Sequence, residues 1–200
     1  MLVDISLQIT PQMVMDAQGN EKKAIAGHLG THFDVMNKEF PLEYTRRAGI
    51  VFDVSSVEGR DIEESDIAID AVSKNMFAAF CTGYIERVGY GGKKYFTDHP
   101  QLSDHLIEAL VQKEVSIIGI DGPGVRRGKE HVQKDQYCAD HGVFITENLC
   151  NLKLLCGKKN LIINTYPMSF AGMTGLPCRV IAEFQADQES GLAESRACSL

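Results

Sequence analysis

The stretch GHLGTHFD, residues 27–34, places two histidines and an aspartate within eight residues. The glycines and the threonine between them disfavour a helix, so we expect an extended segment. Because side chains alternate along an extended chain, His28, His32 and Asp34 would point to one side. Two imidazoles and a carboxylate on one face suit zinc or a related divalent ion and leave positions open for water or substrate. The alternative is a pair of surface histidines in a polar turn.

The regions around this stretch alternate between short apolar runs and amphipathic patterns. Runs that are β-branched or alternating predict strands, and they cover residues 2–9, 23–30, 49–55, 115–122, 160–167 and 178–184. Helical spacing of apolar residues predicts helices at residues 61–75, 100–114 and 129–142. Ser103 is suited to cap the second helix, and Gly142 is suited to end the third. The sequence therefore predicts an α/β fold.

The composition is that of a compact domain, with 200 residues, 44% of them hydrophobic and 24% charged. We expect a single domain over residues 1–184 and a loose C-terminal tail over residues 185–200. The formal net charge of -7 opposes binding to nucleic acid or to anionic membranes. No apolar run is long enough to span a bilayer, and the first residues lack the pattern of a signal peptide. We therefore expect a cytoplasmic protein with reduced cysteines.

The segment HLGTHFD, residues 28–34, resembles the H-x-G-T-H-x-D signature of the cyclase family of metal-dependent hydrolases, whose best-known members are the bacterial kynurenine formamidases. Other segments resemble parts of the family in the expected order, at residues 2–10, 115–125, 141–152 and 166–184. The resemblance implies a swivelling β/β/α domain of the cyclase and kynurenine formamidase type. It also implies a homodimer or homotetramer in which neighbouring subunits can line the active site.

The resemblance also implies roles for single residues. His28, His32 and Asp34 would bind the first metal ion, and Asp34 would bridge to a second ion in dinuclear members. Glu147 matches the distal carboxylate that completes the site in the family. These residues come from distant parts of the chain, so the resemblance predicts that the fold brings them together.

Two positions depart from the family pattern. A histidine that binds the second ion in relatives falls on Asp135, so Asp135 or His131, one helical turn earlier, would bind that ion. His141 is a third candidate, although an exposed position at a helix end is the simpler interpretation. The catalytic acid/base histidine falls on Lys38, and a continued extended segment from Asp34 would present Lys38 beside the metal ligands. Lys38 would then act as a base if a lowered pKa left it neutral, or as a cationic electrophile. The alternative is a solvated surface lysine.

These residues imply metal-assisted hydrolysis. The cofactor would be a divalent metal, with zinc favoured and manganese or magnesium as alternatives, at one or two ions per chain. Such an ion lowers the pKa of bound water and polarises a scissile carbonyl. We therefore expect an arylformamidase-like amidohydrolase or cyclase that acts on an amide (formamide-like) or lactone carbonyl of a small-molecule substrate. The alternative is a family descendant that binds a metal ion or a metabolite without turnover, because the acid/base histidine is missing.

Overall fold

The computed structural model describes residues 1–20 and 27–185. The β-strands are β1 (Leu2–Asp4), β2 (His32–Asp34), β3 (Arg46–Asp53), β4 (Phe77–Cys81), β5 (Ile117–Ile120), β6 (Phe144–Glu147), β7 (Leu161–Pro167) and β8 (Gly175–Glu183). The α-helices are α1 (Pro11–Ala17), α3 (Tyr84–Val88), α4 (Lys93–Thr97), α5 (Asp104–Gln112) and α6 (Lys129–Asp140). Short 3-10 helices lie at Leu42–Thr45, Glu64–Asp66, Ile69–Ala71 and Leu152–Leu155. The predicted α/β fold is confirmed.

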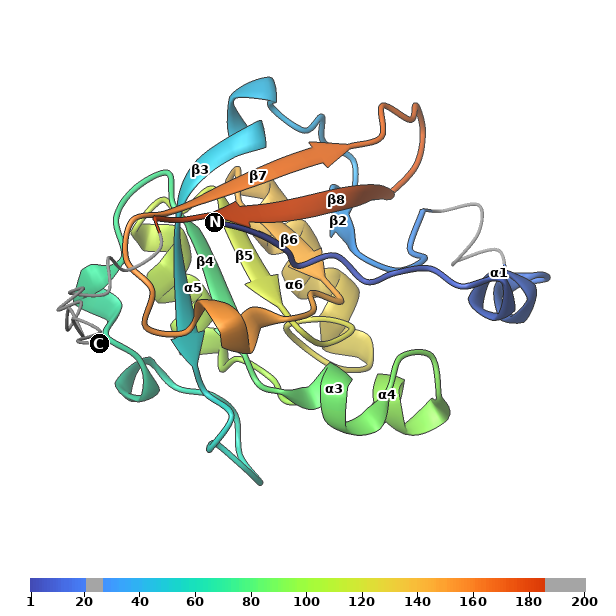
Figure 1. Cartoon of the computed structure of the whole chain (residues 1–200), viewed down its shortest axis with the longest axis horizontal. Coiled ribbons are helices and arrows are strands. Elements are labelled where there is room, and N and C mark those ends of the chain that lie inside the picture. Colours follow the sequence, from blue (N-terminus) through green and yellow to red (C-terminus); the bar gives the residue numbers. More distant parts are fainter. Residues whose placement is uncertain (21–26, 186–200) are drawn as a thin grey trace, which may run out of the picture.

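The strands form one sheet in the order β1-β8-β2-β6-β5-β4-β3-β7, and β7 also pairs with β8, so that the sheet closes on itself (Figure 1). Neighbouring strands from β3 to β6 are parallel. In contrast, β2 runs antiparallel to both β6 and β8. The three-residue strand β2 therefore joins the parallel part of the sheet to the antiparallel part. The pairing of β2 with β6 holds His32 and Asp34 beside β6.

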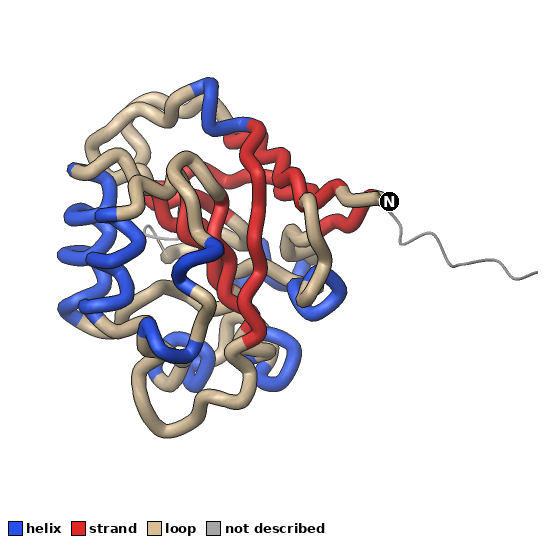
Figure 2. The backbone as a smooth tube through the Cα atoms, turned by 90° about the vertical axis from the view of Figure 1, so that its left-hand side faces the viewer, coloured by secondary structure: helices blue, strands red, loops and turns tan. Residues whose placement is uncertain are grey.

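Two large apolar clusters stabilise the fold, and a smaller one consists of Tyr84, Ile85 and Tyr95. Of the two large clusters, one lies within the closed sheet and includes Phe33 and Phe77. The other lies between the sheet and the helices, and it includes Leu106 and Leu110 of α5. Figure 2 shows helices packed along one side of the strands. The strand β5 has Gly119 where a Cβ atom would overlap the Phe77 ring, so this position requires a residue without a side chain.

Most of the predicted elements are confirmed. Strands overlap the predicted runs at residues 2–9, 49–55, 115–122, 160–167 and 178–184, and the helices predicted at 100–114 and 129–142 are α5 and α6. The Ser103 hydroxyl accepts a hydrogen bond from the backbone N–H of Leu106 and so caps α5. Gly142 follows α6 with a φ of 73°. The local signals for helix ends therefore predicted both boundaries.

The helix predicted over residues 61–75 is wrong. This region instead contains two short 3-10 helices, Glu64–Asp66 and Ile69–Ala71. The Asp66 carboxylate accepts a hydrogen bond of 2.8 Å from the backbone N–H of Glu63, which closes the first turn on itself. Such side-chain bonds to the local backbone compete with a continuous helix.

The strand predicted at residues 23–30 is not formed by the part that the structure describes. Gly27 and Gly30 have φ values of 80° and 72°, and residues 27–30 form a loop. The rest of this predicted strand, residues 23–26, lies outside the described residues, as does the predicted tail from residue 186 onward.

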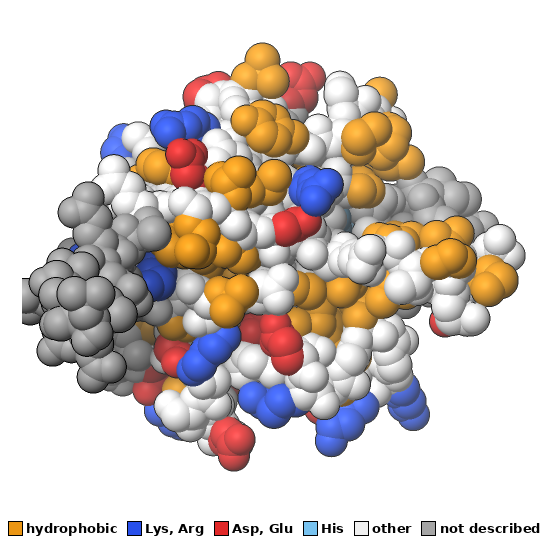
Figure 3. Space-filling model, in the orientation of Figure 1, with side chains coloured by type: hydrophobic (Ala, Val, Ile, Leu, Met, Phe, Trp, Pro, Cys, Tyr) orange, Lys and Arg blue, Asp and Glu red, His pale blue; other side chains and the backbone are white. Residues whose placement is uncertain are grey.

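Two segments project from the body of the molecule, namely α1 and the hairpin between β7 and β8 (Figure 1). Val14 and Met15 of α1 are 47% and 54% exposed, and Met168 and Phe170 of the hairpin are 54% and 42% exposed. Figure 3 shows hydrophobic side chains gathered over both segments. Within residues 1–20 and 27–185, no helix has the length and apolar character that crossing a membrane requires.

Candidate metal centre

Strand β2 presents His32 and Asp34 on the same face of the sheet, as its alternation predicts. His32 stands opposite Glu147 in the antiparallel pairing of β2 with β6. The Nε2 atom of His32 lies 3.6 Å from Asp34 Oδ1 and 3.5 Å from Glu147 Oε2. All three side chains are buried. The strand pairing therefore brings the early and late parts of the predicted site together.

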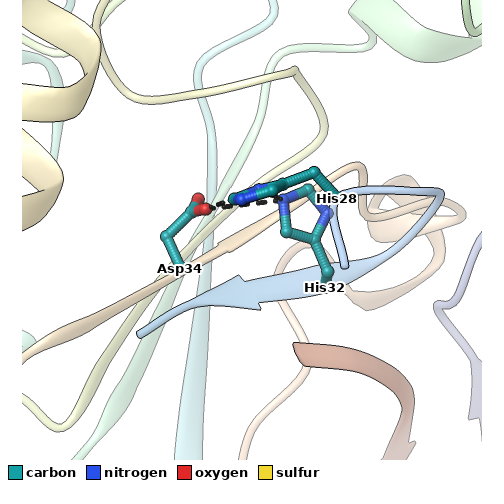
Figure 4. Close-up of side chains that lie close together, drawn as sticks. All are labelled: His28, His32 and Asp34. Atoms are coloured by element: carbon teal, nitrogen blue, oxygen red, sulfur yellow. Dashed lines mark hydrogen bonds and ion pairs between the residues drawn. The ribbon is translucent and has the colours of Figure 1, made fainter. Parts of the chain in front are cut away.

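His28 reaches the same place from a loop rather than from a strand. Gly27 and Gly30 adopt the left-handed backbone that favours glycine, and a Cβ atom on Gly27 would overlap the backbone of β8. This loop brings His28 Nδ1 to 2.9 Å from His32 Nε2 and to 3.0 Å from Asp34 Oδ1 (Figure 4). The ligand atoms of these three residues lie within 4.8 Å of one another, which makes them a candidate metal-binding group.

Helix α6 contributes two further side chains, His131 and Asp135, one turn apart. The Nε2 atom of His131 lies 3.1 Å from Asp135 Oδ2 and 3.3 Å from Glu147 Oε1. Asp34, His131, Asp135 and Glu147 form a second group whose ligand atoms lie within 4.8 Å of one another. Two residues that the sequence offered for the second ion, Asp135 and His131, are therefore in the site, whereas the third candidate, His141, is exposed and belongs to neither group. The two groups share Asp34, and together their six residues are called the ligand cluster below.

The ligand cluster contains carboxylates that its own residues do not fully satisfy. The side chains of Asp34, Asp135 and Glu147 are 1%, 2% and 5% exposed. Each has one buried oxygen without a hydrogen-bond partner among the described residues, namely Asp34 Oδ2, Asp135 Oδ1 and Glu147 Oε1. Burying a carboxylate oxygen without a partner is costly. A divalent cation bound by these oxygens and by the imidazole nitrogens would remove that cost, so the donor set fits such an ion.

Protonation in the cluster reflects the same excess of negative charge. Burial raises the pKa of Glu147 and of Asp135, and the charge of Asp34 raises both further. Burial opposes ionisation of Asp34 as well, but the charge of His32 and hydrogen bonds from His28 and His32 keep the pKa of Asp34 low. Without a cation, Glu147 and Asp135 therefore retain their protons to higher pH than free carboxyl groups.

Neighbouring groups orient the imidazoles. The Gly30 carbonyl accepts a hydrogen bond of 2.8 Å from His32 Nδ1, and this leaves His32 Nε2 directed at the carboxylates. The Nε2 atom of His28 lies 3.0 Å from the Thr174 hydroxyl. Sequence reasoning missed Thr174, because nothing in the sequence places the residue before β8 beside the residues before β2. A search for polar residues in the loop before β8 would have included it.

A cavity of about 710 Å³ opens over the ligand cluster. Besides the cluster, its wall includes Met36, Lys93, Phe96, Pro123, Val132 and Asn148. The volume is in the range of small-molecule sites, and the wall combines apolar side chains with a few polar groups. The ligand cluster is therefore accessible to a small molecule despite the burial of its carboxylates.

Lys38 is not among the described residues that line this cavity. The predicted extended segment from Asp34 to Lys38 is wrong, because Met36 has a φ of 55° and the backbone N–H of Lys38 donates to the Val35 carbonyl. The Nζ atom of Lys38 lies 2.7 Å from the Asp140 carboxylate. The catalytic role of Lys38 therefore stays a prediction from the sequence, while its side chain pairs with the far end of α6.

The model of the Cyclase family matches residues 3–127 of the chain. The chain belongs to the cyclase family. None of the curated proteins matches the chain. The swivelling β/β/α fold expected for a cyclase-family protein is confirmed by the architecture and by similar solved structures.

Three of these structures are similar to the cyclase-family chain over most of its length. A protein described as a potential metal-dependent hydrolase with cyclase activity is 20% identical, with a TM-score of 0.72, and the match covers 91% of this chain and 98% of that one. A "predicted metal-dependent hydrolase" from Bacillus stearothermophilus is 20% identical, with a TM-score of 0.71 and coverage of 91% and 97%. Isatin hydrolase A from Labrenzia aggregata, bound to benzyl benzoate, is 16% identical, with a TM-score of 0.68 and coverage of 91% and 93%. At these identities the likeness shows the fold.

Proposed function

We propose that this cyclase-family chain is a metal-dependent hydrolase that cleaves the amide or lactone carbonyl of a small molecule. The observation that carries the proposal is the position of Asp34, which belongs to both candidate ligand groups and has a buried oxygen without a hydrogen-bond partner among the described residues. The descriptions of similar structures as metal-dependent hydrolases support it. The similar isatin hydrolase supports an amide-type bond, since isatin is a cyclic amide.

The residues that would hold the metal are His28, His32 and Asp34 for one ion, and Asp34, His131, Asp135 and Glu147 for a second. Zinc suits the histidine-rich group, and the carboxylate-rich group also suits manganese or magnesium. When bound, a divalent ion supplies Lewis acidity, which polarises a carbonyl and lowers the pKa of water.

The chain's own residues would bind and orient the reactants. Phe96 and Val132 in the cavity wall would pack against the apolar part of a substrate and exclude water. Burial lowers the pKa of His131, so its imidazole is neutral near pH 7. When no second ion is bound, a neutral His131 can accept a proton at Nε2, which lies 3.3 Å from Glu147. Proton transfer would then come from within the ligand cluster rather than from Lys38.

A second candidate function is a protein that binds a metal ion or metabolite without turnover. One observation favours it. Lys38, at the position of the family's acid/base histidine, pairs with Asp140 and does not line the cavity. If His131 serves only as a metal ligand, the described part of the site has no separate group for proton transfer.

The test is metal content followed by turnover. Protein purified without added metal would be analysed for ions per chain, stripped with a chelator, and reloaded with zinc, manganese or magnesium. A panel of N-formyl arylamines, isatin and small lactones would then be assayed. We expect hydrolysis of at least one class only after reloading, and none from His32→Ala. Stoichiometric metal without turnover of any compound would favour the binding protein. Absence of metal binding would overturn the hydrolase and would leave only the metabolite-binding form of the second candidate.

We also propose that the chain forms a homodimer or homotetramer, as the family resemblance implies. The exposed apolar side chains of α1 and of the β7–β8 hairpin support the proposal, because such side chains are commonly covered in an assembly. Light scattering on the eluting protein measures the mass directly. A mass equal to one chain of 22.1 kDa across the accessible concentration range would overturn the proposal.

A further inference from the structure

Asn148 directly follows Glu147 and is 2% exposed. Its φ is 58°, a left-handed conformation that asparagine tolerates better than most residues other than glycine. This conformation ends β6 and keeps the Asn148 side chain in the wall of the cavity. Sequence reasoning did not select Asn148, although an asparagine immediately after a predicted metal ligand is a signal that could have been used.

All the polar groups of Asn148 have partners. Its side-chain Nδ2 donates a hydrogen bond of 2.8 Å to the Gly30 carbonyl, and its Oδ1 accepts one of 2.7 Å from the Tyr95 hydroxyl. Its backbone carbonyl accepts from the Thr31 hydroxyl at 2.8 Å, and its backbone N–H donates to the Gly122 carbonyl at 3.0 Å. Because a carbonyl can only accept, the amide nitrogen must face Gly30 and the amide oxygen must face Tyr95.

The Gly30 carbonyl has a second donor, His32 Nδ1, at 2.8 Å. The two donors therefore hold one carbonyl oxygen from two directions. A fixed Gly30 carbonyl keeps the proton of His32 on Nδ1 and leaves Nε2 free to act as a ligand. Without the Asn148 amide, the loop before β2 would lose the side-chain bond that ties this carbonyl to β6.

We propose that Asn148, supported by Tyr95, is a positioning residue that sets the tautomer and orientation of His32 for metal binding. The part that concerns metal affinity rests on the proposed function, whereas the part that concerns the His32 tautomer does not. Asn148 thus couples the two sides of the ligand cluster, because it follows one proposed ligand, Glu147, and its side chain orients another through Gly30.

The variant Asn148→Gly separates this role from the turn. Glycine adopts a φ of about 58° without strain, so the end of β6 keeps its conformation while the amide is lost. Tyr95→Phe removes only the hydroxyl that donates to Asn148. The matched control is Asn151→Gly, since Asn151 has a φ of 57°, is exposed, and also donates an amide hydrogen bond, to the Asp4 carbonyl.

Two measurements test the proposal. Zinc affinity would be measured by competition with a chromophoric chelator, and we expect Asn148→Gly to weaken it by roughly 10- to 100-fold, as for other groups that orient a metal-binding histidine. Tyr95→Phe should show a smaller loss, and Asn151→Gly should match the parent. In metal-free protein, at a pH above the pKa of His32, which Asp34 and the Gly30 carbonyl raise against the effect of burial, ¹⁵N NMR should show neutral His32 protonated at Nδ1 in the parent and a mixture of tautomers in Asn148→Gly.

The outcomes distinguish this inference from the proposed function. Parent protein that binds no zinc would remove the proposed function, yet the NMR comparison would still decide the role of Asn148. Unchanged zinc affinity and an unchanged His32 tautomer in Asn148→Gly would overturn the inference while leaving the metal site intact. If Asn148→Gly fails to fold, Tyr95→Phe decides the question by the same two measurements.

Discussion

Two regions of this protein bring potential metal ligands within 4.8 Å of one another, yet they differ in charge and burial. The ligand cluster has three nearly inaccessible carboxylates with unpartnered oxygens. The other region, here called the thiol cluster, consists of Asp53, Cys81 and Cys156. The side chain of Asp53 is 37% exposed and already pairs with Lys153. Of these two regions, the ligand cluster is therefore the one that buries carboxylates whose charge its own residues leave uncompensated.

The protonation of the thiol cluster supports this distinction. Hydrogen bonds from Lys153 and Ser55 lower the pKa of Asp53 to about 2, so its charge is stable without a metal. Burial raises the pKa of both Cys81 and Cys156, which keeps them as neutral thiols. Proximity of ligand atoms is thus insufficient evidence for a metal site. The stronger indication is buried charge that the surrounding residues leave uncompensated.

The largest expected effect is the loss of metal from the ligand cluster in His32→Ala. His32 Nε2 lies close to both Asp34 and Glu147, so its removal takes a central donor from the site. We expect the affinity for zinc to fall by more than the roughly 10- to 100-fold that an orienting neighbour contributes. Cys156→Ser is the matched control from the thiol cluster and should leave zinc per chain unchanged. Equal zinc loss in His32→Ala and Cys156→Ser would contradict the view that the ligand cluster binds zinc and the thiol cluster does not.

The second prediction concerns stability after metal removal. Glu147 and Asp135 have raised pKa values in the folded protein, so folding favours their protonated forms. The sign follows directly, since a folded state that binds more protons loses stability as pH rises above the ordinary carboxyl values of 3.8 and 4.5. We therefore expect the melting temperature of metal-free protein to fall between pH 5 and pH 8, and zinc to reverse that fall.

Glu147→Gln should flatten this pH dependence and raise the melting temperature of metal-free protein at pH 8, while weakening zinc binding. Asp53→Asn should instead lower the melting temperature, because Asp53 has a lowered pKa and its charge is favourable in the folded state. Its effect should be smaller, since Asp53 is partly exposed and solvent screens its ion pair. A lower melting temperature for metal-free Glu147→Gln at pH 8 would contradict the charge argument.

A third prediction sharpens the comparison by changing the thiol cluster itself. Lys153→Ala removes the cation beside Asp53 and leaves a carboxylate next to two thiols. We expect weak cobalt binding, with the sulfur-to-cobalt charge-transfer absorption that thiolate ligands give, and Lys153→Ala combined with Cys156→Ser should lose that absorption. The same absorption in the parent protein would mean that the thiol cluster is a metal site already.

The sequence predicted the parts of the ligand cluster that depend on short-range patterns. Strand alternation places His32 and Asp34 on one side, and helical spacing places His131 and Asp135 one turn apart. Glu147 came from the family resemblance, since its pairing with His32 joins segments far apart in the chain. The thiol cluster could not be predicted, because its ligands meet only through the pairing of β3 with β4 and the packing of the 3-10 helix Leu152–Leu155, which precedes Cys156.

Two features were not predicted, the turn before Lys38 and strand β4, because both depend on contacts with distant parts of the chain. The backbone N–H groups of Val35 and Met36 both donate to the Thr174 carbonyl, at 2.8 and 3.1 Å, and this contact supports the turn that directs Lys38 away. Neither residue near β2 signals the presence of Thr174. Strand β4 was also missed, because all five of its residues are buried and its sequence therefore lacks the polar alternation of a half-buried strand.

The smallest expected effect belongs to Lys38, whose environment resembles that of Lys153 more than that of the ligand cluster. Both lysines pair with a carboxylate near the surface, Asp140 for Lys38 and Asp53 for Lys153. The pairing with Asp140, at the end of α6, keeps the ammonium group away from the cavity wall. We therefore expect Lys38→Ala to leave the zinc content unchanged and to change the hydrolysis rate by no more than about twofold. A general acid or base would instead account for a loss of roughly 10²- to 10⁴-fold.

The control for this comparison is Asp140→Asn, which releases Lys38 without removing it. If Lys38 is only a surface lysine, Asp140→Asn should have the rate and the pH profile of the parent enzyme. If Lys38→Ala instead lowered the hydrolysis rate by roughly 10²- to 10⁴-fold with zinc content intact, the lysine would have to leave Asp140 and enter the cavity during turnover. Proton transfer would then depend on a movement of the turn after β2, and the role predicted from the family pattern would hold despite the resting geometry.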